Sequence, residues 1–185
     1  MNQALGFRAY LVDPNLVGLY DLWAGLSRRL GRLPYRQEID PLDLPPSALP
    51  VMMVLEQETS GRVRCRLAGT LLTHVYGFDP SGWYLDEVMP SEPAAFRRRM
   101  YERVLGERRA AVCRIQFAVP GREFIASDRL YVPALGESSD RPTVLFTAQS
   151  FLTSAEVTGE PDAYGVYELR YDESTVDRRS DDPTR

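Results

Sequence analysis

The stretch Arg64-Cys-Arg-Leu-Ala-Gly-Thr-Leu-Leu-Thr-His-Val-Tyr-Gly77 decides the fold. Val63, Cys65 and Leu67 alternate with arginines, and this period of two predicts a β-strand with one face toward a core. The Ala-Gly step that follows permits a tight turn, and Thr70 is a candidate N-cap for a short helix. The final glycine suits a left-handed helix end. The stretch therefore predicts a strand, a turn and a short helix in succession.

Alternating segments on either side of this stretch predict further strands, and Ser91 to Gly106 has the signals of a longer helix. Pro120-Gly121 is a candidate hairpin turn. We expect an α+β fold with a five-stranded antiparallel sheet, helices on one face and a helix before the first strand. The expected strands cover residues 51–56, 62–67, 111–119, 122–133 and 143–151.

The order of these motifs resembles the PAS domain. A strand ending in Arg-Leu-Ala-Gly-Thr, a short helix closing on Tyr-Gly and a Ser-Gly turn are similar to the first half of that fold. More narrowly, the chain resembles bacterial PAS-like proteins that are often found as single short chains. The resemblance covers roughly residues 15 to 152. Its other motifs are Leu22-Trp23, Leu33-Pro34, Ile39-Asp40-Pro41, Leu49-Pro50 and Tyr131-Val132-Pro133.

This resemblance implies a sensory or interaction module with a space between sheet and helices. It names no ligand, because PAS domains share a scaffold and differ in what they bind. Alternation alone also leads to five antiparallel strands with helices inserted between the second and third. We divide the chain into an N-terminal helix and Pro-rich connector (1–50), a PAS-like core (51–152) and a C-terminal extension with a disordered tail (153–185).

The N-terminal segment carries an apolar stripe at helical spacing from Leu16 to Leu30, with Asn15 as a candidate cap and Gly31 as a candidate end. Two interpretations stay open: the stripe packs on the chain's own sheet, or it forms a homodimer interface. The five prolines between residues 34 and 50 exclude a long helix and predict an ordered connector along the domain edge. Val166 to Tyr171 alternates and is a candidate additional strand, and we expect disorder beyond Asp172.

Composition narrows the function. A net charge of -4 argues against non-specific nucleic-acid binding, and the 22 basic residues are all arginine, which excludes a Schiff-base lysine. With no signal peptide and no apolar run of membrane-spanning length, we expect a soluble cytoplasmic protein without a membrane partner. Cys65 and Cys113 are interpreted as small buried groups in a reducing compartment, with a disulfide as the alternative.

Chemical motifs are sparse. His74 is the one histidine, and a structural or surface role is favoured over haem ligation because no second ligand is near it in sequence. No metal-ligand spacing, flavin-cysteine motif or nucleophile elbow is present, and a triad of Ser91, His74 and Asp86 has little support. We therefore expect no catalytic or metal-binding residues, and the sequence leaves the cofactor unknown. The Arg97-Arg98-Arg99 run is expected to be a solvated helix face, with an anion-recognition or docking patch as the alternative.

The remaining functional signal is the expected cavity. Its apolar walls either fill the core completely or leave a pocket for a small, mostly apolar or aromatic metabolite. Three hypotheses follow: a sensory module, a protein-interaction adaptor with a filled core, and a small-molecule enzyme on an α+β scaffold. The candidate ligand-binding residues are Leu67, Leu71, His74, Val75, Tyr84, Met89, Phe96, Met100, Ile115 and Phe117.

Overall fold

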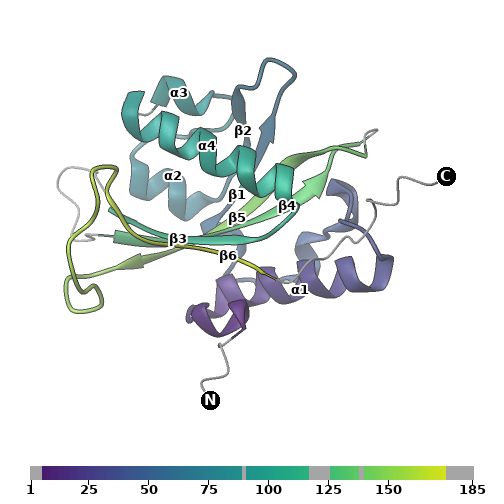
Figure 1. The fold of residues 1–185 in the computed structure, drawn as a ribbon, viewed down its shortest axis with the longest axis horizontal. Coiled ribbons are helices and arrows are strands. Elements are labelled where there is room, and N and C mark those ends of the chain that lie inside the picture. Colours follow the sequence, from purple (N-terminus) through teal and green to yellow (C-terminus); the bar gives the residue numbers. More distant parts are fainter. Residues whose placement is uncertain (1–5, 89–90, 117–125, 138–139, 174–185) are drawn as a thin grey trace.

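The computed structural model describes residues 6–88, 91–116, 126–137 and 140–173 of the chain. Figure 1 shows one twisted antiparallel sheet whose strand order is β2-β1-β5-β4-β3-β6. The strands on both sides of the longest inserted helix therefore join into a single sheet, as predicted. The strands are β1 (Met52–Gln57), β2 (Val63–Ala68), β3 (Ala111–Gln116), β4 (Ala126–Leu135), β5 (Pro142–Leu152) and β6 (Val166–Tyr171).

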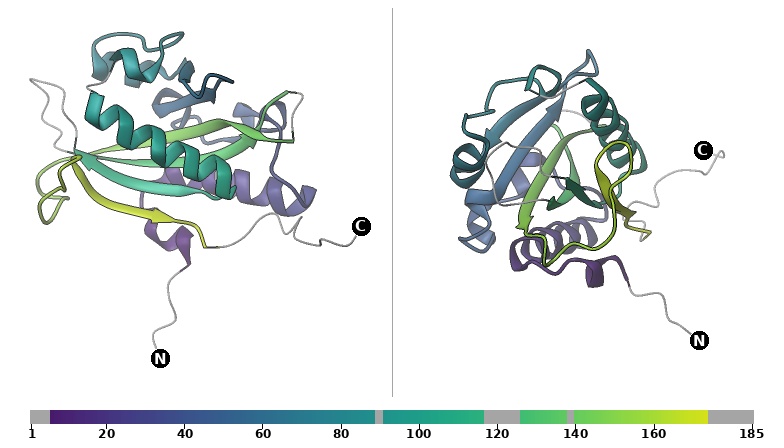
Figure 2. Two further views of the ribbon diagram at one scale, coloured as in Figure 1. Left: turned by 45° about the horizontal axis from the view of Figure 1, so that its top comes forward. Right: turned by 90° about the vertical axis from the view of Figure 1, so that its left-hand side faces the viewer.

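Helices cover both faces of this sheet. The helix α1 (Pro14–Leu30) lies on one face, which we call the outer face. The other three lie on the opposite, inner face, and Figure 2 shows α4 running across it. These are α2 (Thr70–Tyr76), α3 (Leu85–Val88) and α4 (Ser91–Glu107). Short 3-10 helices cover Phe7–Tyr10, Arg36–Glu38, Pro41–Asp43 and Leu49–Val51.

The sheet separates two hydrophobic cores because successive strand residues point to opposite faces. On β4, Leu130 and Val132 lie in the outer core beneath α1, whereas Tyr131 lies in the inner core beneath α4. Apolar residues on both faces of β4 are therefore accounted for by a helix on each side, α1 on the outer face and α4 on the inner face.

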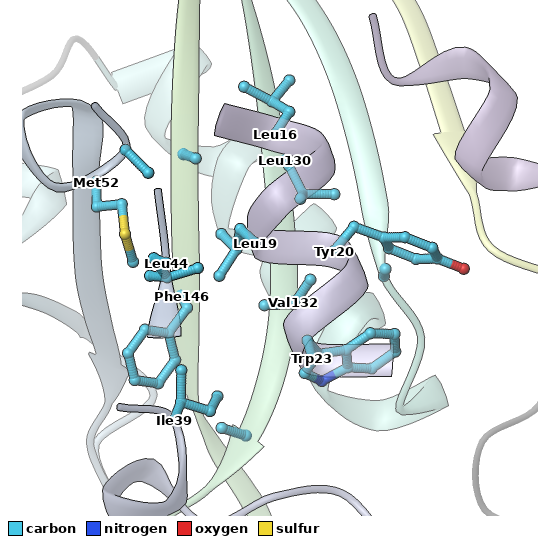
Figure 3. Close-up of a cluster of buried hydrophobic side chains, with 14 of the residues drawn as sticks. Leu16, Leu19, Tyr20, Trp23, Ile39, Leu44, Met52, Leu130, Val132 and Phe146 are labelled. Atoms are coloured by element: carbon cyan, nitrogen blue, oxygen red, sulfur yellow. The ribbon is translucent and has the colours of Figure 1, made fainter. Parts of the chain in front are cut away.

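The apolar stripe of α1 packs on the chain's own sheet (Figure 3). Leu16, Leu19 and Trp23 are at most 1 % exposed, and the Trp23 indole Nε1 donates a hydrogen bond of 2.8 Å to the Pro133 carbonyl. Of the two interpretations left open by the sequence, the structure bears out the first. This stripe is therefore not free to form a homodimer interface.

The Pro-rich connector is ordered and belongs to the same outer core. Leu33, Ile39, Leu44 and Ala48 are all buried there, which confirms the predicted connector along the domain edge. Gly18 of α1 permits this packing, because a Cβ at that position would lie 2.7 Å from the Pro45 ring. The first fifty residues thus contribute a large part of the packing against the sheet.

Two predicted helix caps were wrong. Asp13, not Asn15, caps α1: its carboxylate accepts hydrogen bonds from the amides of Asn15 and Leu16, and Pro14 occupies the first helical position. The N-cap of α2 is Gly69, and Thr70 is already the first residue of that helix. The predicted helix ends are correct, since Gly31 and Gly77 both have positive φ.

The C-terminal extension adds a sixth strand to the sheet. The candidate segment from Val166 to Tyr171 is β6, which pairs antiparallel with β3 and forms the edge of the sheet opposite β2. Directly after it, the buried Asp172 carboxylate accepts a 2.8 Å hydrogen bond from the Tyr20 hydroxyl of α1. Residues from the two ends of the described chain therefore meet. The predicted hairpin at Pro120-Gly121 and the predicted disordered tail lie outside the described residues.

Candidate ligand pocket

A pocket of about 400 Å³ lies on the inner-face side of the molecule, between the β1–β2 turn, α3 and α4. The turn forms because Gly61 has a φ of 80° and its amide donates a hydrogen bond to the Glu58 carbonyl. The pocket's volume is within the range typical of small-molecule sites. It is lined by Ser60, Gly61, Arg62, Val63, Leu85, Asp86, Ala94, Ala95, Arg97, Arg98, Tyr101 and Glu102.

Arg97 is the unusual residue of this lining. Its side chain is only 6 % exposed, and its buried Nε–H has no hydrogen-bond partner. The sequence interpretation placed it on a solvated helix face, and this was wrong for Arg97, although Arg98 and Arg99 are exposed as expected. The physical reason is helical spacing: Arg97 occupies the same stripe of α4 as the buried Met100 and Tyr101.

The charge of Arg97 has no anionic partner among the described residues. Burial opposes this charge, and the neighbouring Tyr131, Tyr101 and Cys113 side chains hold the Arg97 pKa above its usual value, Tyr101 also through its hydroxyl. Burial raises the pKa of Tyr131 and raises that of Cys113 to about 11, so both are neutral at pH 7. An arginine keeps its proton even when buried. Among the described residues, the positive charge of Arg97 therefore has no compensating carboxylate at neutral pH.

The other two arginines of the lining already have carboxylate partners. Arg62 donates to Asp86 at 2.7 Å and to Glu87 at 3.0 Å, and these contacts lower the pKa of Asp86. Arg98 lies 3.8 Å from Glu102, one helical turn away. Both pairs are exposed and contribute little to stability. Their effect on the pocket is to neutralise its rim, so that the positive potential is concentrated at Arg97.

Tyr84 joins β2 to the start of α3 beside this rim. The centre of its ring lies 3.6 Å from the Arg62 guanidinium carbon and 4.4 Å from that of Arg64, which is the geometry of a cation–π contact on both. Its hydroxyl accepts a hydrogen bond from Arg64 and donates one of 2.7 Å to Glu58. We call Arg62, Arg64 and Tyr84 the arginine–tyrosine clamp. The clamp holds the outer wall of the pocket against the edge strand.

Of the ten residues predicted to bind a ligand, the structure describes eight, and these eight are not part of this lining. Val75, Met100 and Ile115 are buried, and Tyr84 and Phe96 are partly buried. Leu67, Leu71 and His74 are exposed on β2 and α2. Met89 and Phe117 lie outside the described residues. The eight described residues of the predicted set therefore do not form one site: some are buried, some are partly buried and some are exposed.

The exposure of Leu67 has a specific cause. In the β1–β2 ladder Leu55 pairs with Cys65 but Val54 pairs with Leu67, so Arg66 is an extra residue on β2. Such a bulge shifts the residues beyond it to the opposite face. Strict alternation placed Leu67 in the inner core with Cys65, and this expectation was wrong: Leu67 is 50 % exposed.

A second depression of about 860 Å³ lies between the β1–β2 turn, the end of α4 and the start of β5. Polar and charged residues such as Glu58, Arg108 and Asp140 dominate its lining. None of the buried polar atoms that lack a partner belongs to it, since those atoms are on Ser27, Arg64 and Arg97. The pocket at Arg97 is therefore the better candidate for a specific site.

The described part of the chain contains neither a disulfide nor a cluster of metal-ligating side chains. Cys65 and Cys113 are free and buried, and three strands separate β2 from β3 in the sheet. At about 4.8 Å per strand this spacing exceeds the reach of a disulfide several-fold. Within the same residues no cluster of three or more metal-ligating side chains occurs, and none of the described helices is long and apolar enough to span a membrane.

The burial of Arg97 was not predicted from the sequence, because Arg97, Arg98 and Arg99 were assigned together to one solvated helix face. The signal was available in the spacing, since Arg97, Met100, Tyr101 and Val104 recur at i, i+3, i+4 and i+7. A charged residue in the first position of an apolar stripe indicates a buried charge with a possible function. The other lining residues, from the β1–β2 turn and α3, gave no such signal.

Comparison with known proteins agrees with this architecture. A model of the PAS domain family matches residues 13–147, which is most of the chain and runs from α1 through the connector and the first four strands into β5. No curated protein matches the sequence significantly.

Proposed function

Because the chain belongs to the PAS domain family, whose members are sensory and regulatory modules, we propose that it is a non-catalytic sensor of a small molecule. The observation that carries this proposal is the pocket of about 400 Å³ between the β1–β2 turn, α3 and α4, with the buried Arg97 in its lining. PAS domains hold ligands between sheet and helices, and this pocket lies on that side of the sheet. We further propose that the protein acts in the cytoplasm.

A ligand in this pocket would contact three elements, the β1–β2 turn, α3 and α4. A ligand that binds one arrangement of α3 and the β1–β2 turn more tightly shifts the population toward it. The clamp would transmit this shift to β2, the edge strand of the sheet. We keep Tyr84, Phe96 and Met100, from the predicted ligand-binding set, as proposed contacts for a larger ligand that reaches beyond the present lining.

An interaction adaptor with a filled core is the second candidate function. It is favoured by four large apolar side chains that are between 41 % and 53 % exposed on or near β2 and α2, namely Leu67, Leu71, Phe78 and Trp83. These residues are a candidate docking surface for a protein partner. Homodimerisation remains a prediction, and it would have to use a surface other than the buried stripe of α1.

Native mass spectrometry of the purified chain and of Ala95→Phe tests the sensor against the adaptor. Ala95 lines the pocket, and a phenyl ring there would extend into the space that a ligand needs. The sensor proposal predicts a small molecule retained by the wild-type chain, or captured from a metabolite extract, and absent from the variant. An apo mass for both proteins after incubation with the extract would favour the adaptor.

A further inference from the structure

We propose that the pocket at Arg97 recognises a small organic monocarboxylate with an apolar or aromatic body, and that Arg97 binds the carboxylate. This inference rests on the proposed function, since it identifies the chemical class of the ligand that the pocket would hold. The observation behind it is that Arg97, a residue only 6 % exposed, belongs to the lining of the pocket and has a buried Nε–H without a hydrogen-bond partner.

A buried, unpaired cation is costly for the folded chain. Burying a charge is tolerated in proteins when the charge is paired and hydrogen-bonded. No carboxylate of the described residues pairs with Arg97, and its polar neighbour is the Tyr101 hydroxyl, one helical turn away. An anion that enters the cavity would supply both the missing charge and the missing acceptor for Nε–H.

The arrangement of charge favours a single negative charge on that anion. The Arg62 and Arg98 guanidinium groups, which also line the pocket, are already paired with carboxylates. Asp86 and Glu102 in the same lining would repel a ligand with further negative charge. One planar guanidinium fork matches one carboxylate in a bidentate pair, whereas a phosphate dianion would need additional donors.

The rest of the lining defines the body of the ligand. Val63, Leu85, Ala94 and Ala95 provide apolar walls, and the Tyr101 ring provides an aromatic one. Tyr101 is itself fixed by a ring contact with Tyr131, whose centroid is 5.3 Å away. A pocket of about 400 Å³ has room for a short aliphatic or a single-ring acid.

Isothermal titration calorimetry with matched probe pairs tests this assignment on the full chain. The acids are butyrate, benzoate and phenylacetate, each compared with its neutral amide, and inorganic phosphate is the control for a general anion effect. The proteins are the wild type, Arg97→Met, Arg97→Lys and Arg99→Met. Arg99 is the matched control because it is the exposed arginine two positions along α4 and does not line the pocket.

We expect at least one acid to bind the wild type and Arg99→Met at least tenfold more tightly than its amide does, and inorganic phosphate to bind no better than the amides. Arg97→Met should lose this preference, and Arg97→Lys should recover part of it because it retains the charge without the planar fork. Far-ultraviolet circular dichroism of each variant establishes that it is folded.

Two results would overturn the proposal, and they differ in what they imply for the sensor. If acids and amides bind equally well and Arg97→Met changes neither, the pocket holds ligands but does not recognise a carboxylate. If none of the acids binds the wild type, the carboxylate class is wrong. The native mass spectra then decide independently whether the pocket binds any small molecule.

Discussion

Arg97 combines a buried charge with a hydrogen-bond donor that has no partner. A folded chain that keeps an unpaired guanidinium inside loses stability, and such costs are typical of binding sites, where function and stability compete. Methionine has a similar length without charge or donor, so it suits a wall shared with Val63 and Leu85. The side chain that we propose to bind the ligand should therefore destabilise the ligand-free protein.

We predict that Arg97→Met stabilises the ligand-free chain by about 1–3 kcal/mol, because an apolar side chain replaces a buried unpaired charge. Urea denaturation at pH 7 measures this change. The exposed Arg99, whose guanidinium lies 5.8 Å from the Tyr164 ring, provides the control, and Arg99→Met should change stability by less than about 0.5 kcal/mol. A stability loss in Arg97→Met larger than in Arg99→Met would mean that Arg97 has a structural partner.

Both cysteines should be unreactive in the native protein. Burial raises the pKa of Cys65 and of Cys113 to about 11, so at pH 8 only about 0.1 % of each thiol is ionised. We expect Ellman's reagent to label neither thiol on the minute timescale, and to label two per chain at once in 6 M guanidinium chloride. Rapid labelling of one thiol in the native state would show that one of the two strands opens locally.

Helices and strands were predictable from the sequence where the spacing of apolar residues and the positions of turn residues indicated the same element. The five expected strands, the candidate strand from Val166, the helix from Ser91 and the ends at Gly31 and Gly77 all follow from patterns that local chemistry enforces. The pattern failed at β2, because the extra residue Arg66 is recognisable only from its pairing with β1. The sequence pattern also did not predict the lining of the pocket. The β1–β2 turn, α3 and α4 are brought together by tertiary packing, which local sequence patterns do not specify.

Gly69 is the position where one element most tightly constrains another. Its amide donates a 2.8 Å hydrogen bond to the Met52 carbonyl, and an added Cβ would lie 2.3 Å from the Pro50 carbonyl oxygen. We predict that Gly69→Ala destabilises the chain by about 2–4 kcal/mol, since backbone must move to admit the methyl group. Thermal denaturation with far-ultraviolet circular dichroism measures it.

Gly25 of α1 provides the control for this substitution. A Cβ there would meet nothing within 4 Å, so Gly25→Ala should stabilise the chain by about 0.5–1 kcal/mol through helix propensity. Equal effects of the two substitutions would contradict the close approach of β2 to the connector.

At the scale of the whole molecule, both faces of the sheet are occupied, and the N-terminal segment is part of the domain. The outer core combines α1, the connector and the outward residues of β1, β4 and β5. Sequence analysis left the location of the α1 stripe open because a stripe of this kind serves either an intrachain or an intersubunit contact. The contact partner is decided by the length and path of the connector, which composition does not specify.

The contact between Tyr20 and Asp172 joins α1 to the residue that follows β6. We predict that Tyr20→Phe costs about 1–2 kcal/mol, because the buried Asp172 carboxylate loses a hydrogen-bond donor. Hydrogen exchange should show faster opening of β6 than in the wild type. Tyr10→Phe is the matched control, because Tyr10 is 37 % exposed and contacts Arg170 through its ring. If Tyr20→Phe leaves the exchange of β6 unchanged, β6 is held by its pairing with β3 alone.

The most direct test of the central claim is the nuclear magnetic resonance signal of the Arg97 Nε–H group, the donor that has no partner in the pocket. It is assigned by its disappearance in Arg97→Lys and followed in the ¹⁵N–¹H spectrum during titration with phenylacetate and with phenylacetamide. The account predicts a downfield proton shift that saturates with the acid and is absent with the amide. A signal unmoved by the acid, while those of Arg62 or Arg98 shift, would contradict it.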